Sequence, residues 1–181
     1  AVFLDRDGVI NRAFVRDGRP YPPADLAALE VLPGVHDALQ RLRNAGFLLL
    51  VVTNQPDVAR GIQTRETVER IHAVLQSTLP IDAFYVCYHT DADGCVCRKP
   101  APGMLLEATR RYHIDLAASY MIGDRWRDVE AGQRAGCTSL FIDYKYAEPL
   151  TTRPDDRVAS LAEGADWILD TVIQKGAFKA G

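Results

Sequence analysis

The sequence predicts an α/β protein with a Rossmann-like three-layer sandwich around a central parallel sheet. Short runs of β-branched and large apolar residues alternate along its 181 residues with segments of helical periodicity, which is typical of βαβ units. Polar and acidic residues follow several of these runs, and in open α/β sheets ligands bind beyond the carboxyl ends of the strands. We expect a single domain over residues 1–181, because this length suits one hydrophobic core and no repeat or low-complexity linker divides it.

Five strands and four helices are expected from the apolar patterns. A helix is expected over residues 34–45, and a second begins at Thr64, which is a suitable N-cap. A third helix follows Pro102. The last begins at Ser160, which forms a capping-box pattern with Glu163. The strands are expected at residues 1–4, 47–52, 83–86, 119–122 and 138–142.

Two segments, residues 12–32 and 88–102, do not fit this alternation and are expected to be loops. The first contains three prolines, and the second combines Gly94 with clustered cysteines. Only short loops follow Asp5 and Thr53, so no large cap domain is expected. The functional site should therefore be rather open.

Composition and charge exclude several classes of partner. The formal net charge of -3 shows no basic excess of the kind that nucleic-acid-binding proteins carry. The longest apolar run, residues 47–52, is far shorter than the roughly 20 residues that span a bilayer. No charged and apolar leader precedes the acidic cluster at Asp5. We expect a cytoplasmic monomer that binds neither nucleic acid nor membrane.

Two carboxylates lie directly after the first expected strand. Asp5 and Asp7 are separated by Arg6, and strand alternation would point them to opposite sides unless the backbone turns. Gly8 makes such a turn easy, so both carboxyl groups can reach one site. A solvated turn would explain this pair equally well by itself.

Other strand ends supply the same edge of the sheet with further polar groups. The second strand ends in Thr53 and Asn54, which offer a hydroxyl and an amide to a phosphate. Lys99 follows the cysteine cluster, and the fourth strand ends before Asp124 and Asp128. Each residue alone could belong to a solvated loop, but their convergence on one edge favours a catalytic site.

A second cluster offers three thiolates and one imidazole, a set that suits tetrahedral zinc. Its members are Cys87, His89, Cys95 and Cys97, all within eleven residues. The spacing departs from the Cys-x-x-Cys knuckle of zinc fingers, so reduced core cysteines or a disulfide are alternatives. Because protein ligands fill all four positions, the expected Zn²⁺ site is structural and closes the loop that presents Arg98 and Lys99.

The order Asp5-x-Asp7-Gly8, Thr53, Lys99 and Gly123-Asp124-x-x-x-Asp128 resembles the haloacid dehalogenase superfamily of phosphohydrolases over most of the chain. This resemblance implies that Asp5 attacks phosphorus to form an aspartyl-phosphate and that Asp7 acts as acid and base. It also implies that Thr53 and Lys99 hold the phosphoryl oxygens. Mg²⁺ is the expected catalytic ion, bound by the oxygens of Asp5, Asp7 and Asp124, with Asp128 orienting these ligands.

The zinc cluster followed by Arg98-Lys99-Pro100 resembles the branch of that superfamily that contains heptose bisphosphate and histidinol phosphatases. Three stretches, residues 5–11, 53–61 and 97–104, are more similar to the heptose enzymes. Pro56-Asp57-Val58 and the short gap between His89 and Cys95 depart from them, which leaves histidinol phosphate and other small sugar phosphates as alternatives. The resemblance implies that the partner is a small phosphorylated metabolite, a sugar bisphosphate, and that it contacts Asp5, Arg6, Asp7, Ala13, Phe14, Val15, Arg16, Thr53, Asn54, Gln55, Arg60, Arg98, Lys99 and Arg125.

Two non-enzymatic classes are alternatives to a phosphatase. Receiver domains also place acids, a threonine and a lysine at strand ends, but their acceptor aspartate lies on a later strand, where this sequence has Thr53. A zinc-stabilised binding module would make the convergence of Asp5, Asp7, Lys99 and Asp124 an accident. The sequence therefore favours a Mg²⁺-dependent phosphomonoester hydrolase.

Overall fold

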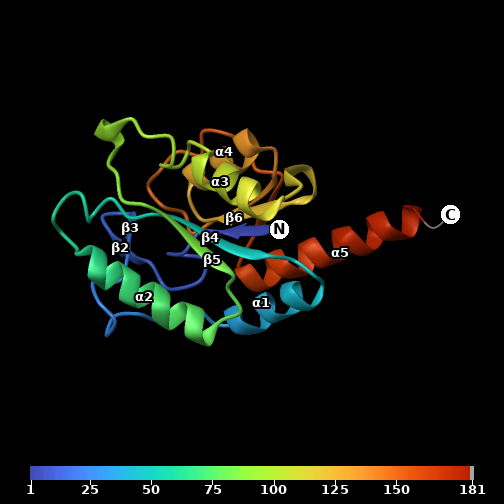
Figure 1. The fold of residues 1–181 in the computed structure, drawn as a ribbon, viewed down its shortest axis with the longest axis horizontal. Coiled ribbons are helices and arrows are strands. Elements are labelled where there is room, and N and C mark those ends of the chain that lie inside the picture. The colour runs from blue at the N-terminus through green and yellow to red at the C-terminus, as the bar shows by residue number, and fades with distance from the viewer. Residues whose placement is uncertain (180–181) are drawn as a thin grey trace.

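A six-stranded parallel sheet forms the middle layer of the computed structural model, which describes residues 1–179 (Figure 1). Its strand order is β5-β4-β1-β6-β7-β8, with parallel pairing throughout. The expected α/β class and parallel sheet are confirmed. The strands are β1 (Val2–Leu4), β4 (Leu49–Asn54), β5 (Ala83–Cys87), β6 (Tyr120–Gly123), β7 (Thr138–Ile142) and β8 (Asp156–Val158).

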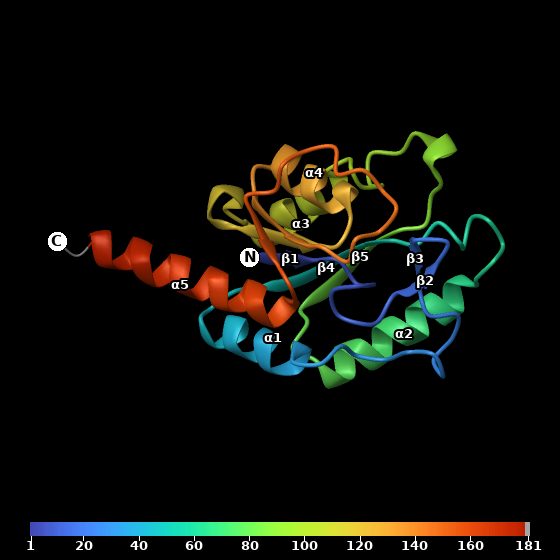
Figure 2. The same cartoon turned by 180° about the vertical axis from the view of Figure 1, so that it is seen from behind.

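Helices cover both faces of the sheet, as Figures 1 and 2 show from opposite sides. Side chains alternate between these faces: Val2 and Leu4 of β1 pack in one apolar cluster, whereas Phe3 packs in the other. Both clusters are buried, so the strands read as continuous apolar runs. The first cluster lies under α1 (Val35–Asn44), α2 (Arg65–Thr78) and α5 (Leu161–Lys179), and the second under α3 (Gly103–Tyr112) and α4 (Trp126–Ala135).

The helix starts follow their sequence signals. The side chain of Thr64 accepts a hydrogen bond from the backbone of Thr67 at 3.1 Å, as an N-cap does. Ser160 accepts one from Glu163 at 3.2 Å, and the Glu163 carboxylate turns back to the backbone of Ala159 at 2.7 Å. All five expected strands are present, although β4 starts and ends two residues later than expected.

The expectation that residues 12–32 form only a loop is wrong. They contain an antiparallel hairpin of β2 (Phe14–Arg16) and β3 (Arg19–Tyr21). Asp17 and Gly18 between them have φ values of 50° and 71°. Positive φ at both central positions matches the right-handed twist of a hairpin, and Asp-Gly is a typical pair for such a turn. The segment 88–102 is irregular as expected, apart from the short 3-10 helix η1 (Asp91–Asp93).

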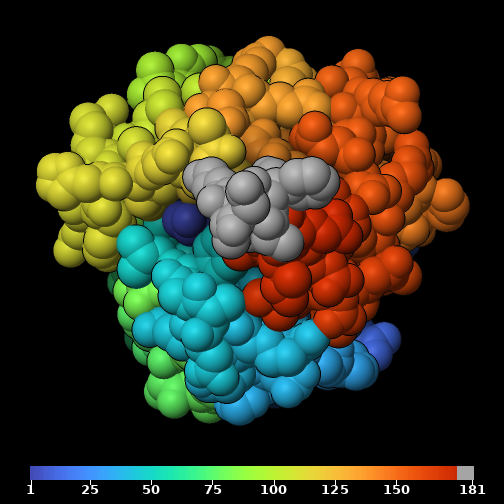
Figure 3. Space-filling view, turned by 90° about the vertical axis from the view of Figure 1, so that its right-hand side faces the viewer, coloured from blue at the N-terminus to red at the C-terminus, as the bar shows by residue number. Residues whose placement is uncertain are grey.

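The strand order creates a crevice at the carboxyl end of β1. The chain passes from β1 outward through β4 and β5, then returns to place β6 on the other side of β1. Ligands bind at such switch points in open α/β sheets. Figure 3 shows the opposite end of the molecule, where the start of the chain (dark blue) lies among α1, α5 and the segment leading into β6. None of the helices described combines the length and apolarity needed to cross a membrane.

Candidate active site

The segment after β1 turns tightly across the end of β6. The backbone N–H of Asp5 donates to the carbonyl of Ile122 at 3.0 Å, which fixes the residue that follows β1 beside β6. Gly8 then adopts a φ of +86°, and a β-carbon there would lie 1.9 Å from Oδ2 of Asp124. Glycine is therefore required for two reasons, its positive φ and the contact with Asp124. This turn brings the first acidic pair to the second, as the sequence predicts.

Lys99 is the buried cation of the site. Its side chain is only 2% exposed, and Nζ lies 2.8 Å from Asp5, 2.6 Å from Asp128 and 2.7 Å from the carbonyl of Val52. The side chain of Asn54 donates to the Lys99 carbonyl and accepts from its N–H, both at 3.1 Å. These contacts hold Lys99 at the end of β4 although it comes from the irregular segment after β5.

Burial and mutual repulsion make two carboxylates of this site, Asp5 and Asp124, hard to ionise. Burial, reinforced by Asp128 and Asp7 and opposed by Lys99, raises the pKa of Asp5 to about 6. Burial also raises the pKa of Asp124 well above its usual range, and Asp5 adds to this effect. For Lys99, burial lowers the pKa, but Asp128 and Asp5 outweigh it and the net pKa is raised. The site therefore favours a bound cation.

The oxygen atoms present fit Mg²⁺. One carboxylate oxygen from each of Asp5, Asp124 and Asp128 lies within 4.8 Å of the others. Oδ1 of Asp124 is buried and accepts no hydrogen bond from the described residues, whereas Oδ2 accepts from Tyr146 at 2.8 Å. Asp128 is already paired with Lys99 and with the N–H of Arg125 at 3.0 Å. Hard oxygen ligands with a free lone pair suit Mg²⁺.

Asp7 is held by four hydrogen bonds from three side chains. Arg6 donates to both carboxylate oxygens, from Nε at 3.1 Å and Nη2 at 2.9 Å. Asn11 donates at 2.9 Å and Gln55 at 2.8 Å, and Gln55 also donates to Thr53 at 2.9 Å. The carboxylate of Asp7 remains 14% exposed and faces the cavity. Buried side chains thus fix the orientation of the Asp7 carboxylate, and its remaining exposed surface is accessible from the cavity.

A cavity of about 420 Å³ opens above these groups. Residues 13–16, expected at its entrance, do not line it, because the returning strand and its end, residues 19–22, lie there instead. Arg6, Thr53 and Gln55 are buried behind the lining, and Asp124 lines an adjoining cavity of about 290 Å³. The expected residues that do line the main cavity are Asp5, Asp7, Asn54, Arg60, Arg98, Lys99, Arg125 and Asp128.

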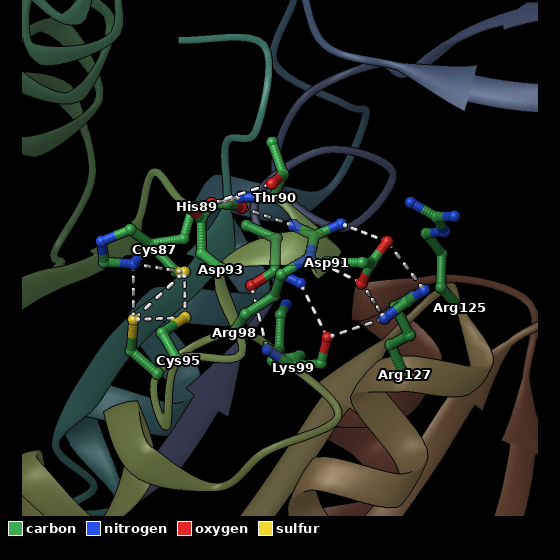
Figure 4. Close-up of polar contacts among 12 residues, drawn as sticks. Cys87, His89, Thr90, Asp91, Asp93, Cys95, Arg98, Lys99, Arg125 and Arg127 are labelled. Carbon is green, nitrogen blue, oxygen red and sulfur yellow. Dashed lines mark hydrogen bonds and ion pairs between the residues drawn. The ribbon is translucent and has the colours of Figure 1, made fainter. Parts of the chain in front are cut away.

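Sequence reasoning did not find two important lining residues, Asp91 and Arg127. Asp91 accepts from Nε of Arg98 and from Nη1 of Arg127, both at 2.9 Å, so one carboxylate joins two guanidinium groups (Figure 4). These hydrogen bonds, Arg98 foremost, lower the pKa of Asp91. The acidic residues at positions 91 and 93 were a possible sequence signal for Asp91. No sequence signal pointed to Arg127, which lies 36 positions from Asp91.

The four expected zinc ligands come together, and Figure 4 shows Cys87, His89 and Cys95 at one side of this arrangement. The Sγ atoms of Cys87 and Cys95 are 3.7 Å apart, those of Cys95 and Cys97 are 3.3 Å apart, and those of Cys87 and Cys97 are 3.1 Å apart. Nδ1 of His89 lies 3.3 Å from Cys97 and 3.7 Å from Cys87. A tetrahedral Zn²⁺ site has ligand separations of about 3.8 Å between sulfurs, so this donor set fits zinc. Within the described residues no cysteine forms a disulfide.

Together with the three-layer fold, this arrangement defines the class of protein, a phosphatase of the haloacid dehalogenase (HAD) type. Residues 96–172 match the family model described as HAD-hydrolase-like. The chain is 40% identical to the D-glycero-beta-D-manno-heptose-1,7-bisphosphate 7-phosphatase of Bordetella bronchiseptica over 78% of its length and 79% of the relative's. It is 35% identical to the enzyme of the same name from Escherichia coli K12, over 95% and 89% of the two chains.

Solved structures agree. A crystal structure of the B. bronchiseptica D,D-heptose 1,7-bisphosphate phosphatase, complexed with magnesium and phosphate, has a TM-score of 0.80 and 33% identity, covering 94% of this chain and 98% of that one. The corresponding enzyme from Burkholderia thailandensis has a TM-score of 0.64 at 26% identity, covering 93% and 97%. The chain belongs to the HAD-like family of D-glycero-β-D-manno-heptose-1,7-bisphosphate 7-phosphatases.

Proposed function

We propose that this protein hydrolyses the 7-phosphate of D-glycero-β-D-manno-heptose 1,7-bisphosphate. The observation that carries the proposal is the cavity, which combines the buried Asp5–Lys99 pair with a rim of five arginines. In this proposal the 7-phosphate reacts at the buried Asp5–Lys99 pair, and the other phosphate of the substrate binds to the arginines of the rim. The rim arginines are Arg19, Arg60, Arg98, Arg125 and Arg127.

The proposed chemistry has two steps. A carboxylate oxygen of Asp5 attacks phosphorus, the bond from phosphorus to the C7 oxygen breaks, and Asp7 donates its proton to that oxygen as it leaves. Water then attacks phosphorus of the aspartyl-phosphate, Asp7 takes a proton from the water, and inorganic phosphate leaves with Asp5 restored. The position of Asp7, exposed in front and held by Arg6 behind, supports both roles.

Lys99 and Thr53 are proposed to hold the phosphoryl oxygens during transfer. Lys99 lines the cavity and is preorganised by Asp5 and Asp128, whereas Thr53 is buried and bonded to Gln55. Asp5, Asp124 and the backbone carbonyl of Asp7 would hold Mg²⁺, which would supply positive charge to offset the negative charge of the phosphoryl group. Asp128 orients this set through Lys99.

Charge at the rim supports a substrate with a second anionic group. Arg98 and Arg127 share the single carboxylate of Asp91, which leaves one positive charge in excess on this triad. Guanidinium groups bind phosphate oxygens through paired, charge-assisted hydrogen bonds. The zinc ligands flank the segment that carries Asp91, so a structural Zn²⁺ would keep this rim in place.

The test compares kcat/KM for three substrates in Mg²⁺ buffer, because this ratio measures discrimination. We expect heptose 1,7-bisphosphate to be favoured at least about tenfold over heptose 7-phosphate, and more over histidinol phosphate, whose cationic end does not suit an arginine rim. The Asp5→Asn variant, folded by circular dichroism, should release no phosphate. Preference for histidinol phosphate would refute the substrate, and turnover by D5N would refute the mechanism.

We also propose that residues 1–181 form a single phosphatase domain. Helices from both halves of the chain cover one continuous sheet, and both apolar clusters of the described residues pack against that sheet. A monomer is proposed as well, since the cavity is lined by residues of one chain. Sedimentation equilibrium would test this, and a dimer at assay concentrations would contradict it.

A further inference from the structure

The chemistry above leaves the buried imidazole of His72 unused. His72 lies on α2 and is 7% exposed. Its ring stacks on Phe84 of β5, with centroids 4.4 Å apart and an interplanar angle of 17°.

The partner of His72 is Arg6, in the turn that carries the acidic pair. Nε2 of His72 and Nη1 of Arg6 are 2.9 Å apart, and both side chains are buried. A guanidinium group is always protonated and has no acceptor, so Arg6 is the donor. Nε2 is therefore the acceptor, the ring proton is on Nδ1, and the imidazole is neutral. Burial and the charge of Arg6 agree with this state, since they lower the pKa of His72 to about 3.

Arg6 connects His72 to Asp7. Nε and Nη2 form one edge of the guanidinium and bond both oxygens of Asp7, while Nη1 points to His72. Because the guanidinium is planar, fixing Nη1 also fixes the direction of the edge that faces Asp7. Imidazole, guanidinium and carboxylate thus form a chain that begins on α2 and ends at the cavity.

We propose that His72 is a positioning residue for proton transfer at Asp7. As a neutral acceptor it holds Arg6 in the orientation that presents the Asp7 carboxyl group to the leaving oxygen. The inference rests on the proposed acid role of Asp7. A histidine that served packing alone would need its ring against Phe84 but not its acceptor atom.

Three substitutions separate the acceptor from the ring. His72→Phe keeps an aromatic ring for stacking and removes the acceptor. His72→Gln places an amide oxygen near the position of Nε2, whereas His72→Asn places it near that of Nδ1. The proposal expects H72Q to retain activity and H72F and H72N to lose it, so H72N still tests the role if H72F does not fold.

The readout is the dependence on the leaving group, measured as kcat/KM, which reports the phosphoryl-transfer step from free enzyme. A sugar alkoxide needs a proton from Asp7 in order to leave, whereas p-nitrophenolate leaves without one. H72F and H72N should lower kcat/KM for the sugar phosphate about tenfold and for p-nitrophenyl phosphate less than about twofold. H72Q should stay near the parent for both substrates.

Asp7→Asn provides the reference for this experiment. If D7N loses far more activity on the sugar phosphate than on the aryl phosphate, the acid role of Asp7 stands, and equal losses on both substrates in folded H72F and H72N would overturn the role of His72 alone. Unchanged activity in both variants would overturn it too. If D7N shows no difference between leaving groups, the acid role fails and the inference about His72 fails with it.

Discussion

Gly8 packs so closely against Asp124 that a β-carbon on this glycine would lie 1.9 Å from Oδ2. The contact joins the turn after β1 to the end of β6, the two segments that carry the proposed Mg²⁺ ligands. Gly8→Ala should displace the Asp124 carboxylate, because the new methyl group would overlap Oδ2 and Cγ of this short side chain, which has little room to move. We expect the Mg²⁺ concentration for half-maximal activity to rise about 10- to 100-fold.

Gly46→Ala is the matched control for this substitution. Gly46 has a similar positive φ of +89°, but a β-carbon there would meet nothing within 4 Å. Both alanines should lower stability by about 1 kcal/mol or somewhat more through backbone strain. Only G8A should change the Mg²⁺ dependence, and an identical Mg²⁺ titration for the two variants would show that the contact does not matter for the metal.

Lys99 offers a second prediction, since it is buried between Asp5 and Asp128. Lys99→Met leaves these carboxylates and Asp124 without their cation. We expect the free energy of unfolding to fall by about 3–5 kcal/mol in metal-free buffer and activity to fall at least about 100-fold. Urea unfolding with and without Mg²⁺ would measure the first effect, and the ion should restore part of the loss.

Lys145→Met serves as the control, because Lys145 pairs with Asp143 but its side chain is 81% exposed. Loss of an exposed pair should change stability by less than about 1 kcal/mol. If K99M unfolds at the same urea concentration as K145M, Lys99 does not offset the acidic cluster.

The central part of the site could be predicted from the sequence because parallel strands place their carboxyl ends together. Asp5 follows β1, Asp124 follows β6, and Lys99 is held at the end of β4. These three strands are adjacent, so the proximity of the three residues depends only on the sheet. The zinc ligands were found by residue type and spacing within one segment. The hairpin was missed although Asp17-Gly18 gives a local signal for it, because the prolines around it favour a loop.

Contacts between segments far apart in the chain could not be predicted in this way. Arg127 reaches Asp91 across 36 positions, and His72 reaches Arg6 across 66. Such pairs depend on how a helix is rotated and where an irregular segment runs, which periodicity does not specify. His72 also lies on the buried stripe of α2, where an apolar residue would fit the pattern equally well.

The zinc cluster gives a third prediction. Cys97→Ser removes a ligand that directly precedes Arg98 and Lys99, so it should lower both zinc content and activity. Elemental analysis should give about one zinc per chain for the parent and much less for C97S, with an earlier thermal transition. Cys137→Ala is the control, since this buried thiol lies outside the cluster. Full activity in a zinc-free parent preparation would rule out a structural zinc.

His72 predicts a pH effect on stability. Its pKa is lowered to about 3 from the usual 6.5, so the unfolded chain binds more protons between these values and stability is lost as pH falls through this window. The loss from this one group amounts to about 2 kcal/mol at pH 5. Urea unfolding would measure the fall in the free energy of unfolding from pH 7 to pH 5, which should be smaller by that amount in H72F than in the parent. An equal fall in both proteins would contradict the neutral, buried imidazole.

Arg127 gives a test of the rim, and besides Asp91 it contacts only the backbone carbonyl of Lys99 among the described groups of the catalytic centre, at 3.3 Å. It shares Asp91 with Arg98, lies over the ring of Trp126 and lines the cavity, so its charge is preorganised for an anion. Arg127→Met should raise KM for the heptose bisphosphate about 10- to 100-fold, the effect of one charge-assisted contact. Turnover of p-nitrophenyl phosphate, which has no second phosphate, should stay the same.

Arg134→Met is the control on the same helix, because Arg134 pairs with Glu130 and does not line the cavity. Equal effects of R127M on the bisphosphate and on the aryl phosphate would mean that Arg127 acts on the reacting phosphate or on folding. An unchanged KM for the bisphosphate would show that the second phosphate does not bind at Arg127 but at another part of the rim. A rise confined to the bisphosphate, absent in R134M, is what a distal phosphate contact requires.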